Sequence, residues 1–137
     1  MSIAGLRFGH VAFKVADVAR SVRWYGDALG ARKIYHAPAQ NGRPELMFLE
    51  FARGQHVELF AGGKNLMASP ADPIGYQHFC VVVDDLEQAL THLAKMNVAP
   101  DRKFIGRARQ RIAFISDPDG NSIELMEIPP DSEIYRD

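Results

Sequence analysis

The stretch HVAFKVADVARSV, residues 10–22, recurs in outline 68 residues later as HFCVVVDDLEQAL, residues 78–90. Each copy begins with histidine, alternates through a strand-like run, and then reaches aspartate followed by apolar residues at helical spacing. Alternation with a period of two predicts a strand, and aspartate before a 3.6-residue pattern predicts the start of a helix. The sequence therefore predicts the same strand–helix unit twice, which indicates an internal duplication.

A second match closes each half of the chain. FLEFARGQHVELF, residues 48–60, aligns with FISDPDGNSIELM, residues 114–126, at an offset of 66 residues. The alignment pairs Glu58 with Glu124, and each glutamate lies between two apolar residues of an expected strand. A carboxylate at the same place in both copies needs an explanation beyond chance, because such a strand would otherwise be buried.

We expect one domain over residues 1–137, of class α+β. It would consist of two βαβββ modules at residues 7–62 and 75–128. The Gly- and Pro-rich residues 62–74 would link the modules, and the polar residues 129–137 would form a loosely held tail.

The expected elements follow from periodicity and helix-end signals. Asp17 is the expected N-cap of the first helix and Gly30 its end, whereas Asp84 or Asp85 would cap the second helix. The expected strands lie at 8–15, 31–36, 45–51, 56–61, 77–83, 102–105, 110–116 and 121–128, with helices at 17–29 and 85–96. The apolar helix faces would consist of Val18, Val22, Tyr25 and Leu29 in the first helix and of Leu86, Leu90 and Leu93 in the second.

Composition excludes several classes of protein. The 137 residues are 47% apolar and 24% charged, with a net charge of −1 and a pI of about 6.5. This balance argues against a nucleic-acid binder and against an electrostatic membrane anchor. No apolar run approaches the ~18 residues of a transmembrane helix. The single Cys80 excludes an internal disulfide, and the opening MSIAGLRFGH lacks the apolar stretch of a signal peptide, so we expect a cytoplasmic protein.

Histidine or glutamate stands on one face of four expected strands. Because strand side chains alternate, these residues face away from the larger aliphatic side chains that would pack on each helix. That second face also carries apolar residues, so we infer a partly shielded cup rather than open solvent. The four titratable residues are His10, Glu58, His78 and Glu124, and their apolar neighbours are Ala12, Phe60, Cys80, Val82 and Met126.

Two carboxylates facing a shielded cup need a counter-charge, which a divalent cation would supply. The two imidazoles and two carboxylates suit Ni²⁺, Zn²⁺, Co²⁺, Mn²⁺ or Fe²⁺ better than a cysteine-type structural zinc site. A lone strand histidine is usually a surface or core residue, so the prediction depends on all four residues occupying matched positions of the repeat. His56 is a competing ligand because it shares the face of Glu58. Cys80 shares the face of His78 but is expected to be a small buried apolar residue.

Residues 10–30, HVAFKVADVARSVRWYGDALG, and residues 117–127, DPDGNSIELME, resemble the opening strand and helix and the closing hairpin of the vicinal oxygen chelate superfamily. That superfamily includes glyoxalase I, methylmalonyl-CoA epimerase, extradiol dioxygenases and the fosfomycin and bleomycin resistance proteins. The resemblance covers about residues 8–128. It implies paired modules that form an open eight-stranded, barrel-like cup around a metal. The first and last strands of each module would be neighbours, which would bring each histidine beside its glutamate.

The set of four filled ligand positions is similar to that of glyoxalase I. Extradiol dioxygenases use two histidines and one carboxylate, and leave the position of Glu58 without a ligand. The resemblance therefore implies a metal-dependent glyoxalase-I-like lyase or isomerase of the lactoylglutathione lyase type. Such an enzyme transfers a proton through a metal-bound enediolate of a substrate with adjacent oxygens. Glu124 would be both ligand and proton shuttle, and Glu58 would be the second catalytic carboxylate opposite it.

Two departures from bacterial glyoxalase I concern glutathione recognition. Lys14 stands where an arginine that binds glutathione is expected, and ELFAGG, residues 58–63, lacks an expected asparagine. Lys14 and three arginines of GRARQR are the candidate substrate-binding residues. Arg107, Arg109 and Arg111 would alternate onto one strand face and hold a carboxylate or a CoA phosphate, although a solvated strand face explains them equally well.

Two alternative functions stay open. A methylmalonyl-CoA-type epimerase would use the same proton chemistry, and a non-catalytic module that binds a drug or metabolite would hold no tightly bound metal. All three functions imply a small-molecule ligand. The exposed sheet edges of two paired modules also predict a homodimer.

Overall fold

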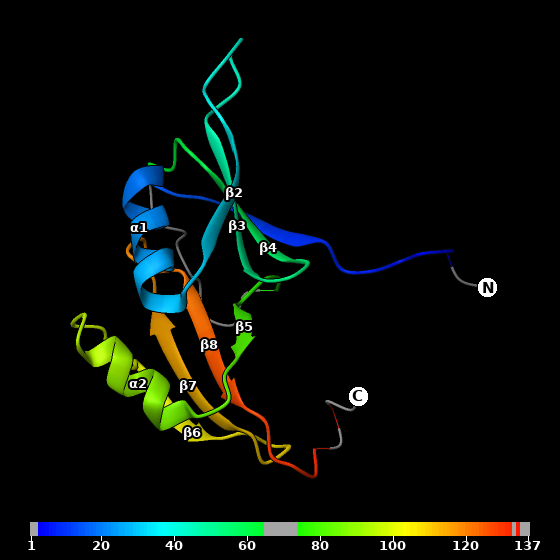
Figure 1. The fold of residues 1–137 in the computed structure, drawn as a ribbon, viewed down its shortest axis with the longest axis vertical. Coiled ribbons are helices and arrows are strands. Elements are labelled where there is room, and N and C mark those ends of the chain that lie inside the picture. The colour runs from blue at the N-terminus through cyan, green and yellow to red at the C-terminus, as the bar shows by residue number, and fades with distance from the viewer. Residues whose placement is uncertain (1–2, 65–73, 133, 135–137) are drawn as a thin grey trace. The chain divides into compact units, whose positions relative to one another are not determined.

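The computed structural model of the chain describes residues 3–64, 74–132 and 134 (Figure 1). It contains two four-stranded sheets and two helices, which confirms the predicted α+β class with two βαβββ modules. The chain divides into two compact units, Met1–Leu66 and Met67–Asp137, here called unit 1 and unit 2. Residues 65–73 of the expected linker lie outside the described residues.

Unit 1 contains one helix and four strands. In chain order these are β1 (His10–Lys14), α1 (Val18–Leu29), β2 (Arg32–Ala37), β3 (Leu46–Ala52) and β4 (Gln55–Phe60). The strand order in the sheet is β1-β4-β3-β2, so the first and last strands of the module are neighbours. They run parallel, whereas the two hairpin pairs are antiparallel.

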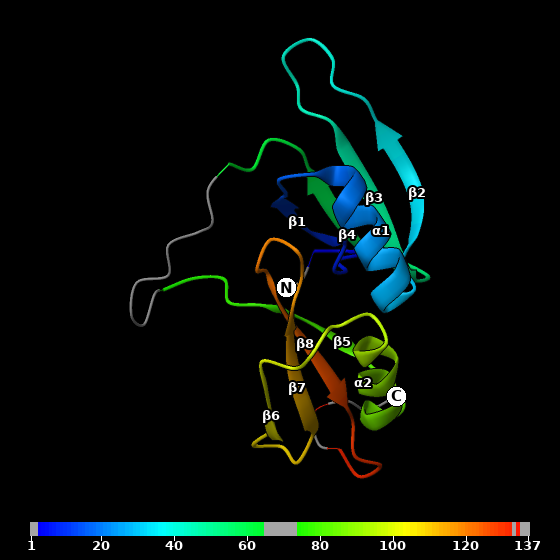
Figure 2. The ribbon, with the colours of Figure 1, turned by 90° about the vertical axis from the view of Figure 1, so that its left-hand side faces the viewer.

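Unit 2 repeats this arrangement. Its elements are β5 (Phe79–Val82), α2 (Leu86–Ala94), β6 (Arg102–Ile105), β7 (Arg111–Ser116) and β8 (Ser122–Glu127). The strand order is β5-β8-β7-β6, and the first and last strands of the module, β5 and β8, are again parallel neighbours. Figure 2 shows each helix beside its own sheet, where α1 contacts β3 and α2 contacts β7 and β8.

Three of the four predicted helix ends are confirmed. The Asp17 side chain accepts a hydrogen bond from the backbone N–H of Arg20 at 2.9 Å, and Asp85 does the same for Gln88 at 2.9 Å. Gly30 ends α1 in the left-handed conformation with a φ of 70°, which glycine adopts without a steric penalty. Helix α2 ends at Ala94, two residues before the predicted end.

The buried face of α1 is rotated slightly from the predicted one. It consists of Val18, Ser21, Tyr25 and Ala28, whereas Val22 and Leu29 are only partly buried. Small side chains at positions 21 and 28 allow the helix to approach its sheet closely, which a pattern of large apolar residues does not reveal.

Burial alternates along β4 and at the start of β8, as predicted. Val57 and Leu59 of β4 and Ile123 and Leu125 of β8 are each at most 2% exposed. The glutamate between each pair faces the other way and is partly buried. Neither α1 nor α2, the helices of the described residues, is long and apolar enough to cross a membrane.

Candidate functional site

In unit 1, His10 and Glu58 meet on one face of the sheet. Strand β1 runs parallel to β4 in a register that places Ala12 beside Glu58. His10 lies two residues before Ala12, so it shares that face and reaches along the strand toward the carboxylate. The Nε2 atom of His10 lies 3.0 Å from Oε2 of Glu58.

Unit 2 repeats this pair with the same register. Cys80 of β5 lies beside Glu124 of β8, and His78 comes two residues before Cys80. The Nε2 atom of His78 lies 2.8 Å from Oε2 of Glu124. The predicted neighbourhood of histidine and glutamate is therefore confirmed in both units. His78 itself lies just outside β5, which begins at Phe79.

The carboxylates are better shielded than the imidazoles. The Glu58 and Glu124 side chains are each 13% exposed, whereas those of His10 and His78 are 42% and 29% exposed. Each pair thus consists of a partly exposed imidazole next to a largely buried carboxylate. A bound cation would therefore meet two donor atoms that already lie together.

A phenylalanine completes each pair and was not assigned a role from the sequence. Phe48 lies beside Glu58 across β3 and β4, and its ring meets the His10 ring edge-on at 5.2 Å. Phe114 lies beside Glu124 in the same way, with the His78 ring edge-on at 4.9 Å. The alignment of the two halves pairs Phe48 with Phe114, so the repeat itself contained this signal. Each ring packs edge-on against its histidine and so limits the movement of the imidazole.

The donor atoms fit a divalent cation. Two ligands at right angles on an ion with ~2.1 Å bonds are about 3.0 Å apart, close to the separation in each pair. One imidazole nitrogen and one carboxylate oxygen per pair suit a borderline transition metal. Within residues 3–64, 74–132 and 134, no group of three or more His, Cys, Asp or Glu side chains is placed to hold a metal. Each unit by itself thus supplies two donors, and the predicted set of four requires both pairs.

The competing ligand His56 has another partner. Its Nε2 atom lies 3.0 Å from Oε2 of Glu50, whose Oε1 atom accepts a hydrogen bond from Arg32. The backbone N–H of Gly54 also donates to Glu50, at 3.3 Å. The hydrogen bond to His56 and then that to Arg32 hold the pKa of Glu50 below its usual range. His56 therefore belongs to a separate charged cluster, formed by Arg32, Glu50 and His56.

Cys80 differs from its prediction as a buried apolar residue. It is exposed, because β5 is an edge strand of its sheet. Desolvation by neighbouring groups, with a smaller contribution from the charge of Glu124, raises the pKa of the Cys80 thiol to about 12. Its thiolate, the form that binds metals, is therefore disfavoured.

The prediction that three arginines share a strand face is wrong. Residues 106–110 form the turn between β6 and β7, closed by a hydrogen bond from the Arg109 N–H to the Gly106 carbonyl at 2.9 Å. Arg109 has a φ of 66° there, and its side chain pairs with Asp131 at 2.9 Å. This ion pair also attaches part of the tail that was expected to be loose.

Only one of the three arginines lies in a strand. Arg111 begins β7 and pairs with Glu87 at 2.8 Å and with Glu127 at 3.2 Å. Arg107 lies exposed in the turn. Lys14 ends β1 on the same side as His10, and it is also exposed. A role in substrate binding for these four residues stays a prediction.

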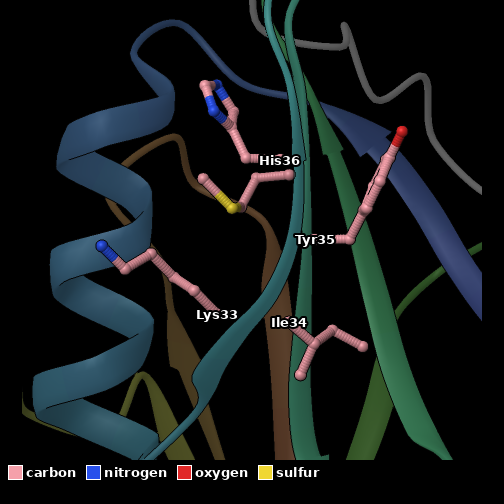
Figure 3. A pocket seen from close by; sticks show the side chains of 5 residues that line it. Lys33, Ile34, Tyr35 and His36 are labelled. Carbon is pink, nitrogen blue, oxygen red and sulfur yellow. The ribbon is translucent and has the colours of Figure 1, made fainter.

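A shallow hollow of about 340 Å³ lies along strand β2 in unit 1. Figure 3 shows Lys33 pointing toward α1, whereas Ile34 and Tyr35 both point away from it. The pairing of β2 with β3 shifts between Lys33 and Tyr35, and such a β-bulge places two successive residues on one side. Tyr35 therefore lies beside Phe48, on the face that carries Glu58, with their rings 6.4 Å apart.

Comparisons with known proteins support the fold and the resemblance. The family model described as Glyoxalase/Bleomycin resistance protein/Dioxygenase superfamily matches residues 7–125. A lactoylglutathione lyase of Pseudomonas aeruginosa is 28% identical, over 94% of this chain and 86% of that protein. One of Schizosaccharomyces pombe is 26% identical over 92% of this chain, which spans about half (46%) of its length. The crystal structure of a glyoxalase family protein from Enterococcus faecalis matches with a TM-score of 0.80 at 19% identity, covering 91% of this chain and all of that one.

Proposed function

Because the chain belongs to the glyoxalase/bleomycin resistance protein/dioxygenase superfamily, we propose that it is a metal-dependent, glyoxalase-I-like lyase or isomerase. Its substrate carries oxygens on two adjacent carbons. The observation that carries this proposal is the repeated pairing of histidine with glutamate, at 3.0 Å in unit 1 and 2.8 Å in unit 2. Relatives named lactoylglutathione lyase support the same function.

The four ligands of the proposed cation are His10, Glu58, His78 and Glu124. Bound there, a divalent ion would supply positive charge that acidifies the C–H bond next to a carbonyl and stabilises negative charge on the adjacent oxygens. The protein supplies the base. Glu124 takes the proton from one carbon and returns it to the neighbouring carbon, and Glu58 serves as the second catalytic carboxylate.

For a hemithioacetal R–S–CH(OH)–CO–R′, this transfer gives the thioester R–S–CO–CH(OH)–R′. The proton leaves the carbon attached to sulfur and reaches the former carbonyl carbon, and the hydroxyl and carbonyl exchange places. Substrate and product are isomers, so no oxidant or reductant is consumed. An acyl-CoA epimerase would remove and return a proton at a single carbon with the same groups, and a binding module would catalyse neither reaction.

Metal analysis of the purified protein tests the ligand set. We expect about one divalent ion per chain, and a loss of metal affinity of at least ~100-fold in His78→Ala, because losing a residue that only orients a ligand already costs about 10–100-fold. His10→Ala should lose the same metal rather than half of it, since the proposed set of four ligands includes both pairs. His36→Ala is the matched control, because His36 pairs with Glu45 at 2.9 Å outside the repeated positions.

Unchanged metal content in His78→Ala, or an equal loss in His36→Ala, would contradict the assignment. Activity is then measured with the methylglyoxal–glutathione hemithioacetal and with methylmalonyl-CoA. Conversion of the first supports the lyase and conversion of the second the epimerase. A protein that holds no metal and converts neither would be a binding module. We also propose that the chain forms a homodimer.

A further inference from the structure

A row of side chains crosses the sheet of unit 2 on the face that carries Glu124. Arg102 on β6 lies beside Phe114 on β7, which lies beside Glu124 on β8. Cross-strand partners share a face. Arg102 therefore faces the same side of the sheet as the His78–Glu124 pair, two strands away from Glu124.

Aromatic rings hold the Arg102 guanidinium in place. Its Cζ atom lies 4.1 Å from the centre of the Phe114 ring and 5.6 Å from that of Phe104. The two rings are stacked, with an interplanar angle of 12° and centres 6.1 Å apart. A guanidinium over an aromatic face is attracted to the ring and keeps its N–H edge available for an acceptor.

The charge of Arg102 is not neutralised within the part of the chain that the structure describes. No ion pair joins Arg102 to a carboxylate there, whereas three nearby basic residues are all paired. Lys103 pairs with Glu87, Arg109 with Asp131, and Arg111 with Glu87 and Glu127. An oriented arginine without a carboxylate partner, on the face of a proposed catalytic glutamate, fits an anionic ligand.

The two units differ at the position of Arg102, although the rest of the row of side chains is the same in both. In unit 1, Tyr35 lies beside Phe48, which lies beside Glu58. Histidine, glutamate and phenylalanine thus recur in both units, but the outermost residue is tyrosine in one and arginine in the other. The duplicated fold does not require arginine at this position, which favours a role in recognition.

We propose that Arg102 is a specificity-determining residue that binds a carboxylate on the substrate. This rests on the proposed function, because Glu124 must be near the reacting carbon. Strands are about 4.8 Å apart, so Arg102 and Glu124 are separated by roughly 10 Å of sheet, which the two side chains shorten. A carboxylate a few bonds from the reacting carbon therefore reaches the guanidinium while the carbon lies near Glu124.

Two hemithioacetals of equal size test the proposal. They are formed from methylglyoxal with 3-mercaptopropionate, which carries a carboxylate, and with 3-mercaptopropionamide, which is neutral. We expect the wild type to prefer the first by about 10–100-fold in kcat/KM, the range of a charge-assisted hydrogen bond. Arg102→Leu keeps the apolar contact with Phe114 and should lose the preference through KM, with kcat nearly unchanged.

Two further variants separate recognition from general effects. Arg102→Lys keeps the charge without the planar stack and should retain part of the preference. Lys103→Gln removes the same charge from the same strand, but the Lys103 side chain pairs with Glu87 of α2. This variant should therefore keep the full preference. Equal loss for both substrates in Arg102→Leu, or loss of preference in Lys103→Gln, would overturn the proposal.

If neither hemithioacetal is converted, that result counts against the proposed function alone. A binding measurement then still tests whether Arg102 recognises a carboxylate. The probes are the unreactive S-methyl thioethers of the same two thiols, added to ¹⁵N-labelled full-length protein. The Nε–H signal of Arg102, identified by its absence in Arg102→Leu, should shift with the carboxylate probe and not with the amide. A signal that responds to neither probe, or equally to both, would overturn the inference. A response to inorganic phosphate but not to the carboxylate probe would do the same.

Discussion

Glu58 and Glu124 have closely matched surroundings, which makes them a useful pair for testing the mechanism. Each is 13% exposed, each lies within 3.0 Å of a histidine, and each lies beside a phenylalanine. Charge and burial alone therefore predict equal effects when either carboxylate is neutralised. The proposed proton shuttle predicts unequal effects.

We expect Glu124→Gln to retain substantial metal and to lose at least ~100-fold in kcat, since a general base typically contributes about 10²–10⁴-fold. Glutamine keeps an oxygen that can bind a cation but lacks the basic site. Glu58→Gln should lose less, and turnover with metal content in both variants provides the measurement. Similar losses would indicate an electrostatic role for both, and a larger loss in Glu58→Gln would reverse the two roles.

The lowered pKa of Glu50 leads to a prediction of how the free energy of unfolding depends on pH. His56, Arg32 and the Gly54 N–H all interact with the ionised carboxylate, and its pKa is lowered in the folded protein. Ionised Glu50 thus stabilises the fold above the pKa of an unfolded glutamate, ~4.3, and this contribution is lost as the pH falls through the lower folded value. Urea unfolding of the wild type and Glu50→Gln should show a difference at pH 7 that shrinks below about pH 4. A difference that stays constant or grows on acidification would contradict this.

At the scale of elements, Glu127 connects the last strand to the start of α2. Its Oε2 atom accepts a hydrogen bond from the backbone N–H of Leu86 at 2.8 Å and also pairs with Arg111. The first N–H groups of a helix have no partner within the helix, so this carboxylate satisfies one of them beside the Asp85 cap. We expect Glu127→Ala to destabilise the protein by about 1–2 kcal/mol, the usual cost of losing a helix cap. Glu127→Gln keeps an acceptor and should cost less in the same urea titration, so equal losses would argue against the capping role.

The elements were predictable where periodicity extended over a whole strand or helix. Alternation placed β4 and β8 with the correct inward residues, and Asp17 and Gly30 correctly marked the ends of α1. The prediction that the arginines of GRARQR share a strand face failed, because alternating arginines in so short a segment fit a strand and a turn equally well. The turn depends on the backbone hydrogen bonds of Gly106 with Gln110 and Arg109. It also needs Arg109 in the left-handed region, a conformation that arginine rarely adopts.

At the scale of the whole molecule, the duplication carried most of the information about the site. Matched positions selected the two histidines and the two glutamates, because equivalent residues of a repeat occupy equivalent places on their sheets. That each histidine lies beside its glutamate was implied by the resemblance to the vicinal oxygen chelate superfamily. The same reasoning missed features that only one unit has. The β-bulge that turns Ile34 and Tyr35 to one side, the partner of His56, and the contact of Arg102 with Phe114 all depend on residues that differ between the halves.

The proposed homodimer follows from edges that the two sheets leave open. Strands β2 and β6 are edge strands with exposed apolar side chains, among them Ile34 at 42% and Ile105 at 64% exposure. Open edges with apolar side chains favour association, and a charge placed there opposes it. Light scattering at ~10 µM, a concentration at which a dimer with submicromolar Kd is largely formed, should give close to twice the chain mass of 15.3 kDa. Ile34→Lys or Ile105→Lys should lower that mass, whereas Leu6→Lys, at a 75% exposed residue outside the strands, should not. A monomeric wild type, or a mass that none of the edge variants changes, would exclude association through these edges.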